Sequence, residues 1–166
     1  MSAKKDTAVI VVDMQVAFIG SMPDLERVRL IDSNISLLEH CQNRDVPVVG
    51  LKYTRRGNYP DELESAVNNI PGSRFLYKRD DDGFTNPRLR NHLKRLGVER
   101  IVITGVNAGF CVQSTAESAL HEGFKIATSK DLIAHNSGVG SLTSAYNWFR
   151  KNGTLFERYQ DMLRTL

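Results

Sequence analysis

One of the two cysteines stands where an apolar run gives way to a helical pattern. Cys111 follows the run RIVITG, residues 100–105, and the loop VNAGF, and it opens the helical segment CVQSTAESAL. A thiol in the first turn of a helix lies near the positive end of the helix dipole, which lowers its pKa and favours the thiolate. The position therefore predicts a nucleophile, although a buried structural cysteine is the alternative for any lone thiol.

Two charged residues have contexts that would suit partners of this thiol. Asp13 ends the apolar run TAVIVVD, where an ionised carboxylate needs a cation or a proton. It would serve as a general base with a pKa set by a neighbouring lysine, or else as a helix cap or a structural salt bridge. Lys78 follows the apolar triplet FLY and precedes Arg79, and spacing alone does not separate these two cations.

Two further groups of charges are open to a functional and a plain interpretation. The acidic run at residues 80–82 has the look of a calcium loop but lacks the glycine and glutamate that follow in one, so it predicts a solvated loop. Arg55 and Arg56 follow an apolar run and would either grip a substrate carboxylate bidentately or stand as solvated loop charges.

The elements that must position these residues alternate along the chain. Strand-like apolar runs occupy residues 7–13, 46–53, 100–105 and 124–129, helical patterns occupy residues 24–43, 87–96, 111–122 and 141–152, and a short apolar run covers residues 154–156. Strands that alternate with helices of this length predict βαβ units with right-handed crossovers. The expected fold is α/β, a three-layer αβα doubly wound and mainly parallel sheet.

Ligands of such sheets bind at the carboxyl ends of the strands. Asp13, residues 53–54 and the loop 105–111 all follow strand-like runs, so we expect them to meet at one rim. The longest irregular part, residues 57–74, would fold over this rim as a lid. Neither a repeat nor an interdomain linker interrupts the pattern, which predicts a single domain over residues 1–166.

Composition narrows the class of protein. The 166 residues are 41% hydrophobic and 25% charged, which is ordinary for a globular domain, and no apolar run approaches the ~20 residues of a membrane span. The net charge of +3 arises from 22 basic and 19 acidic residues that are interleaved, which argues against a nucleic-acid partner. The N-terminus shows no apolar leader, so we expect a cytoplasmic protein without a structural disulfide.

Several segments together resemble the isochorismatase-like cysteine hydrolase superfamily. They are VIVVDMQVAF at residues 9–18, the K-x5-F pattern from Lys78 to Phe84 with its continuation NPRLRNHLKRLGVERIVITG, GVNAGFCVQSTAESALHEGF at residues 105–124 and SKDLIA at residues 129–134. The resemblance covers almost the whole chain in order and spacing. It implies an isochorismatase-like fold with Asp13, Lys78 and Cys111 as the catalytic set, and so selects Lys78 over Arg79.

The resemblance also implies a reaction. Asp13 would take the proton of Cys111 and later deliver it to the leaving amine, Lys78 would tune both groups, and the thiolate would form a thioester that water cleaves. It implies a cis peptide at Val106–Asn107 as well, which would aim the backbone N–H of Asn107 inward to form an oxyanion hole with the N–H of Cys111.

The remaining expectations concern substrate and partners. The substrate-binding candidates are Phe18, Arg55, Phe84 and Phe110. The expected substrate is a small amide-like molecule, the expected partner is a second copy of the chain in a homo-oligomer, and no membrane partner is expected. The apolar residues near the C-terminus would serve such an interface or the core of the monomer.

The sequence departs from metal-dependent relatives of this superfamily. Nicotinamidases bind a metal through Asp-x-His-x-x-x-His after the second strand, whereas residues 53–59 read YTRRGNY here, and no histidine lies between His40 and His92. We therefore expect no cofactor and no metal, and we expect His40, His92 and His121 on helix surfaces. Cys41 is expected to be a small buried hydrophobe. Relatives that cleave a vinyl ether lack the cysteine, which favours cleavage of a carbon–nitrogen bond.

Two other functions compete with that of a hydrolase. A catalytically idle relative would act as an oligomeric scaffold or a ligand sensor, and the intact set of Asp13, Lys78 and Cys111 argues against it. A thiol redox protein of similar topology would need a resolving cysteine, but Cys41 is far from Cys111 in sequence.

Overall fold

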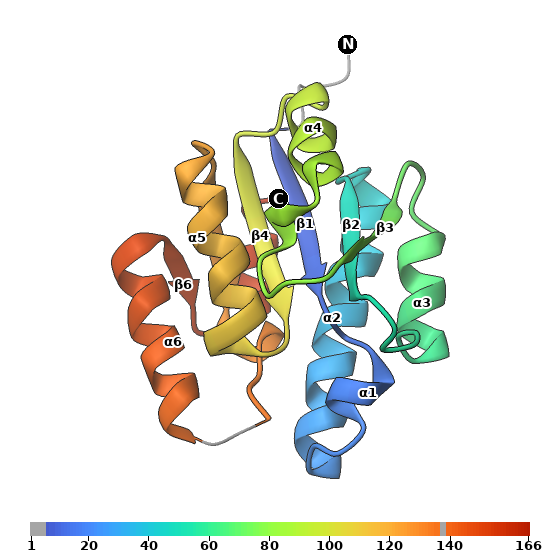
Figure 1. The fold of residues 1–166 in the computed structure, drawn as a ribbon, viewed down its shortest axis with the longest axis vertical. Coiled ribbons are helices and arrows are strands. Elements are labelled where there is room, and N and C mark those ends of the chain that lie inside the picture. Colours follow the sequence, from blue (N-terminus) through green and yellow to red (C-terminus); the bar gives the residue numbers. More distant parts are fainter. Residues whose placement is uncertain (1–5, 137–138) are drawn as a thin grey trace.

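The computed structural model describes residues 6–136 and 139–166 and has one parallel sheet at its centre (Figure 1). Its six strands lie in the order β3-β2-β1-β4-β5-β6, and every neighbouring pair is parallel. They are β1 (Thr7–Val12), β2 (Val48–Tyr53), β3 (Arg74–Lys78), β4 (Arg100–Gly105), β5 (Lys125–Ser129) and β6 (Thr154–Phe156). The predicted three-layer, doubly wound α/β fold is confirmed.

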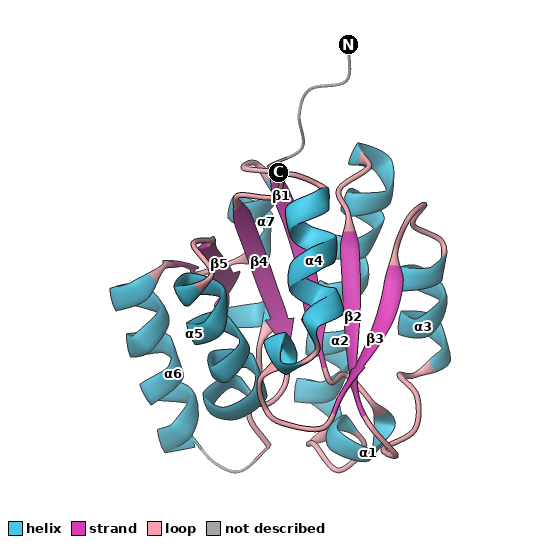
Figure 2. Cartoon of the chain, turned by 45° about the horizontal axis from the view of Figure 1, so that its top comes forward, coloured by secondary structure: helices cyan, strands magenta, loops and turns pink. Residues whose placement is uncertain are grey.

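Helices cover both faces of the sheet (Figure 2). The α-helices are α1 (Val16–Ile19), α2 (Asp24–Arg44), α3 (Asp61–Asn68), α4 (Pro87–Arg95), α5 (Gln113–His121), α6 (Val139–Asn152) and α7 (Tyr159–Leu163). Helices α2, α3 and α7 pack on one face and α4, α5 and α6 on the other, while the short α1 lies at the rim. Short helical turns add Gly83–Thr85, Ala108–Val112 and Lys130–Leu132.

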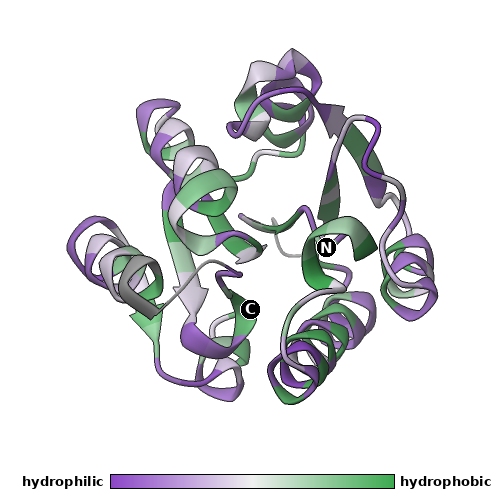
Figure 3. Ribbon diagram, turned by 60° about the horizontal axis from the view of Figure 1, so that its bottom comes forward, coloured by the Kyte–Doolittle hydropathy of each residue, from purple (hydrophilic) through white to green (hydrophobic). Residues whose placement is uncertain are grey.

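Strand β1 shows why the centre of the sheet is apolar on both faces. All six of its residues are buried. Because successive side chains of a strand point to opposite faces, Val9 and Val11 join the cluster beneath α2 and α3, whereas Ala8, Ile10 and Val12 join the cluster beneath α4, α5 and α6. In Figure 3 the strands are mostly hydrophobic, and the surrounding helices carry hydrophilic residues on their outer sides.

The segment expected to be irregular, residues 57–74, is instead partly helical, so that prediction is wrong for residues 61–68, while a role as a lid stays a prediction. Residues 61–68 form α3, in which Leu63 and Val67 are buried while the other residues are not, and the helix packs against α2. The segment has three apolar residues in eight, Leu63, Ala66 and Val67, a stretch too short to have been recognised as a helix from the sequence. Strand β3 was also unmarked, because only Leu76 and Lys78 are buried in it.

The order of the strands creates the place for a site. The chain runs from β1 outward to β2 and β3, and then returns to β4 on the other side of β1, so β1 and β4 flank a topological switch point. Gly105 ends β4 with φ of 111°, and a Cβ there would lie 2.0 Å from the carbonyl oxygen of Val12. Glycine thus lets the ends of β1 and β4 approach closely.

Within residues 6–136 and 139–166, every helix is too short or too polar to cross a membrane.

Candidate active site

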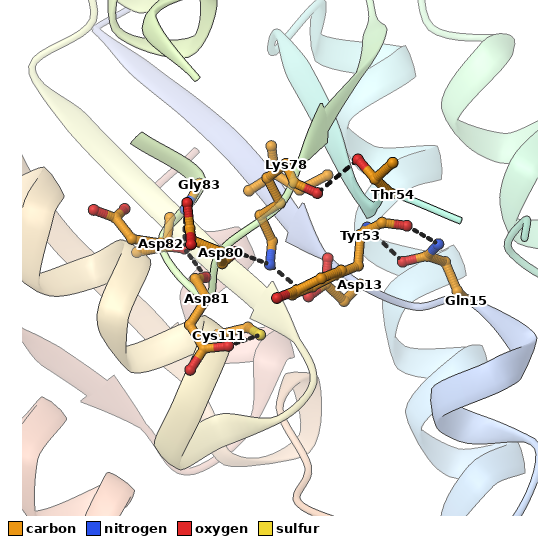
Figure 4. A network of polar contacts seen from close by, with 12 residues as sticks. Asp13, Gln15, Tyr53, Thr54, Lys78, Asp80, Asp81, Asp82, Gly83 and Cys111 are labelled. Atoms are coloured by element: carbon orange, nitrogen blue, oxygen red, sulfur yellow. Dashed lines mark hydrogen bonds and ion pairs between the residues drawn. The ribbon is translucent and has the colours of Figure 1, made fainter. Parts of the chain in front are cut away.

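A buried ion pair links the ends of two strands. Asp13 comes directly after β1 and Lys78 is the last residue of β3, and Lys78 Nζ lies 2.8 Å from Asp13 Oδ2, with side chains 0% and 2% exposed respectively. Lys78 Nζ also donates to the carbonyl of Asp80 at 2.9 Å and lies 4.4 Å from the centre of the Tyr53 ring. The ammonium group is therefore held on several sides at the carboxyl ends of β1, β2 and β3 (Figure 4).

The Cys111 thiol lies on the other side of the switch point, in the helical turn Ala108–Val112 that leads into α5. Its Sγ donates to Asp81 Oδ1 at 3.5 Å, and the residue is half-buried. The thiol lines a cavity of about 350 Å³. The walls of this cavity are Phe18, Tyr53, Arg56, Asp81, Asn107, Phe110 and Cys111.

The electrostatics of this thiol differ from the prediction. Burial first, and then the charge of Asp13, raise the pKa of Cys111 to about 12, and Lys78 offsets this only in part. The expected lowering by a helix N-terminus is wrong for two reasons: Cys111 is the fourth residue of its turn, and it faces the carboxylates of Asp13 and Asp81. The group at rest is a thiol, so its proton must leave as the sulfur attacks.

The base beside it is also perturbed. Burial raises the pKa of Asp13 above its usual value, against the opposite influence of Lys78. A carboxylate with a raised pKa is a stronger base than an exposed one, and its distance to Lys78 keeps it paired when ionised.

Gln15 positions this part of the rim, and the sequence reasoning missed it. Its side chain is fully buried and accepts from Tyr53 N at 2.7 Å, while its amide nitrogen donates to the carbonyls of Tyr53 at 3.0 Å and Gly57 at 2.8 Å. These bonds tie the loop after β2 to the segment that carries Asp13. The available signal was an amide two residues after the acid in an apolar segment.

Asn136 joins two other segments that border the cavity of the thiol. Its backbone N–H donates to Asn107 Oδ1 at 2.9 Å, and its side chain donates to the carbonyl of Phe18 at 3.1 Å and to Ser21 Oγ at 2.8 Å. The peptide Val106–Asn107 is cis, at the position that the resemblance implies. Asn136 thus connects the loop after β4 to α1.

The structure separates the four substrate-binding candidates. Phe18 and Phe110 line the cavity of the thiol. Arg55, with φ of 64°, lines a neighbouring depression instead, and Arg56 takes the place expected for it. Phe84 packs against Phe124, with ring centres 6.1 Å apart, in the cluster beneath α4, α5 and α6.

The acidic run is exposed in part, as predicted, but it is also part of the site. Asp80 supplies a carbonyl to Lys78, and Asp81 supplies a carboxylate to the thiol. Asp82 accepts from Phe84 N at 2.8 Å and from the Ser118 hydroxyl, and so caps the following turn. The predicted solvated loop is thus confirmed for the exposed Asp80 and Asp81, and the contacts of the run with Lys78 and the thiol were not predicted.

His40, His92, His121 and the second cysteine do not line this cavity, whereas His135 accepts from Gly109 N at 3.3 Å and packs against Phe110 of the cavity wall, with ring centres 5.0 Å apart. His121 is exposed and His40 half-buried, but His92 is buried in α4 and burial lowers its pKa, so its expected place on a helix surface is wrong. Cys41 is fully buried, as predicted, and burial raises its pKa to about 12. In the part of the chain that the structure describes, His, Cys, Asp and Glu do not cluster in threes as a metal site requires.

The protein is thus a Rossmann-like α/β protein with a thiol, a carboxylate and a lysine at the switch point of its sheet. The chain belongs to the isochorismatase family, since the Isochorismatase domain model matches residues 7–153. Streptothricin hydrolase of Streptomyces noursei is 31% identical over 139 residues, which are 76% of this chain and 54% of that protein. The chain thus spans about half the length of that relative.

Solved structures share the fold. The nicotinamidase SaPncA from Staphylococcus aureus superimposes with a TM-score of 0.83 at 21% identity, over 92% of this chain and 99% of that one. The YcaC product of Escherichia coli, described as an octameric hydrolase of unknown specificity, gives a TM-score of 0.81 at 21% identity, over 92% and 76% of the two chains. Hydrolases that act on amides are thus among the members of the family.

Proposed function

We propose that this chain is a metal-independent cysteine amidohydrolase that cleaves the C–N bond of a small amide through a thioester on Cys111. The observation that carries the proposal is the fully buried pair of Asp13 and Lys78, 2.8 Å apart, next to a thiol that opens onto a cavity. Perturbed titratable groups gathered in one cleft are typical of active sites.

In the first half of the proposed reaction, Asp13 is the general base. The pKa of Cys111 is about 12, so the proton passes to Asp13 as Sγ bonds to the carbonyl carbon. Lys78 stabilises the carboxylate before the transfer. The backbone N–H groups of Asn107 and Cys111 would bind the oxyanion, and both residues border the cavity. Asp13 then returns the proton to the leaving nitrogen as the C–N bond breaks, which leaves an acyl thioester.

In the second half, water replaces the amine. Asp13, again ionised, takes a proton from water while the oxygen attacks the thioester carbonyl, and the C–S bond then breaks. The sulfur recovers the proton from Asp13. The sum is amide plus water giving acid plus amine, with neither oxidant nor metal required.

A panel of small amides tests this proposal by ammonia release, with mass spectrometry of the intact protein to detect the acyl adduct. We expect turnover in the wild type and in Cys41→Ala, which removes the buried second thiol, and loss of turnover in Cys111→Ala. Full turnover in Cys111→Ala would refute the mechanism. Ligand binding without any turnover by the wild type would instead favour an idle relative that serves as a scaffold or sensor.

We further propose that residues 1–166 act as one domain, in the cytoplasm, and as a homo-oligomer, without nucleic-acid or membrane partners. The exposed Val16, Leu25 and Val28 on α1 and α2 support self-association, and the fold relative YcaC is described as octameric. Light scattering coupled to gel filtration measures the mass, and a monomer at all concentrations would exclude the oligomer.

A further inference from the structure

A second hollow adjoins the cavity of the thiol. It has a volume of about 350 Å³ and is lined by Tyr53, Thr54, Arg55 and Arg79, so the two hollows share Tyr53. A third, of about 460 Å³, shares Thr54 and Arg79 with the second. The lining residues of the hollows thus form a row along the carboxyl ends of β2 and β3, from Cys111 through Tyr53 to Arg55 and Arg79, and we call this row the track.

The pairing of the strands explains why the two arginines are neighbours. Tyr53 of β2 lies opposite Lys78 of β3, so the residues that follow each strand emerge side by side. Thr54 fixes this arrangement, because its backbone N–H donates to the carbonyl of Lys78 at 2.8 Å and its hydroxyl donates to the same oxygen at 2.9 Å (Figure 4). The register thus brings Arg55 and Arg79 to one hollow.

The charged residues differ between the two ends of this track. Arg55, Arg56 and Arg79 are exposed, and none of them takes part in the ion pairs found among residues 6–136 and 139–166. At the other end, Asp81 lies 3.5 Å from the thiol sulfur. The thiol cavity thus holds one acid and one cation, Asp81 and Arg56, whereas the second hollow is lined by two arginines and no acid. Asp81 favours N–H donors near the thiol, and an anionic group of a ligand is attracted more strongly beyond Tyr53.

We propose that Arg55 and Arg79 form a subsite for a carboxylate on the acyl part of the substrate. The proposal rests on the proposed hydrolase function and names its substrate class, namely amides whose acyl chain ends in an anionic group. The guanidinium groups bind the carboxylate through charge-assisted hydrogen bonds, the chain crosses the Tyr53 ring, and the amide nitrogen faces Asp81.

Binding is measured first, independently of turnover. The probes are the methyl-ketone analogues of succinamate, glutaramate and adipamate, in which a methyl group replaces NH2, and calorimetry reports their affinity for the wild-type protein. We expect Arg55→Gln and Arg79→Gln each to weaken the best probe by about fivefold to tenfold, and added salt to weaken it further. Arg95→Gln, an exposed arginine at the end of α4, is the matched control and should not change the affinity.

Turnover is measured second, with each amide acid compared with its neutral mate, such as succinamate with butyramide. The ratio of kcat/KM for the anionic over the neutral amide should exceed one in the wild type and in Arg95→Gln, and should fall in Arg55→Gln and Arg79→Gln through a higher KM. Such a split indicates binding of the carboxylate rather than damage to the thiol.

The outcomes separate the two proposals. Equal affinities in Arg55→Gln, Arg79→Gln and Arg95→Gln would overturn the subsite, as would a preference for neutral amides, while leaving the hydrolase intact. Arginine-dependent binding without turnover of any amide would support the subsite and refute the hydrolase. Displacement of the best ketone probe by inorganic phosphate is also measured. If phosphate acts at a lower concentration than the other two ketone probes do, the assignment to a carboxylate is overturned.

Discussion

Two buried lysines, Lys52 and Lys78, have similar surroundings and different consequences. Each belongs to a strand next to the rim, each is almost wholly buried, each pairs with a carboxylate and each lies over an aromatic ring. Lys52 pairs with Glu64 of α3 and donates to Asn58 Oδ1 at 3.0 Å. Its charge is therefore used to fasten α3 and the preceding loop to β2.

Lys78 uses its charge differently. Its acid, Asp13, is also a neighbour of the Cys111 thiol, and this thiol borders a cavity. A buried ion pair is therefore not by itself a sign of function. What distinguishes the two pairs is a third reactive group and access for a substrate.

Neutralising each acid in turn tests whether the two ion pairs differ in function. Asp13→Asn removes the general base, and we expect turnover of the best amide to fall by about 100-fold to 10,000-fold. Glu64→Gln is the matched control, and its turnover should stay close to that of the wild type because Glu64 pairs with Lys52 and does not line the cavity of the thiol. Ammonia release measures both, and equal losses would show that the two pairs do not differ in kind.

The converse experiment concerns stability. Lys52→Met leaves Glu64 without its cation in a site where that side chain is only 25% exposed, and we expect a loss of about 2 kcal/mol in the free energy of unfolding. Lys130→Met breaks an ion pair with Glu157, whose side chain is 68% exposed, and should change the free energy of unfolding much less than Lys52→Met does. Urea unfolding curves measure both changes. A Lys52→Met protein as stable as the wild type would remove the structural role of this lysine.

The pH dependence of alkylation sharpens the description of the thiol. Because the pKa of Cys111 is raised to about 12, its thiolate fraction is small at neutral pH, and the rate of reaction with iodoacetamide should rise about tenfold per pH unit between about pH 7 and pH 10. Peptide mass spectrometry follows Cys111, with the buried Cys41 as the unreacted internal reference. A rate that levels off near pH 7 would instead indicate a preformed thiolate.

The smallest expected effect comes from Asp81. Its charge contributes to the raised pKa of Cys111, so Asp81→Asn should lower that pKa and speed alkylation at a given pH by about threefold. Asp80 is a neighbouring exposed residue that contacts Lys78 through its backbone carbonyl and not through its carboxylate. Asp80→Asn should therefore have a smaller effect. Equal rates in Asp81→Asn and the wild type would argue against the contact between Asp81 and the thiol.

The sequence predicted the centre of the fold and the ends of its strands well. Continuous β-branched runs, such as β1 and β4, are buried on both faces and leave an unambiguous pattern, and the polar residues that follow them must lie at the rim. Asp13 and Cys111 could be identified as candidate site residues for this reason. The family resemblance, rather than spacing, selected Lys78 over Arg79.

The rest depended on distances that no local pattern encodes. The pKa of Cys111 is raised first by burial and then by two carboxylates, one about a hundred residues away in sequence and the other thirty, so its position near a helix end did not predict the direction of the shift. The role of Gln15 follows from two carbonyl groups that accept from its amide, one at the end of β2 and one in the loop after it. Arg55 and Arg56 differ in position because φ of Arg55 is positive, which turns the chain between them.

The switch point between β1 and β4 also has a kinetic consequence. The carboxylate and the ammonium come from the first half of the chain, and the sulfur comes from the second, across a parallel pairing of β1 with β4 that no short turn can form. Contacts between such distant segments form late, because the connecting chain must lose conformational entropy before the stabilising contacts between them can form. During refolding, recovery of the cavity should therefore lag behind the appearance of helices and report completion of the molecule.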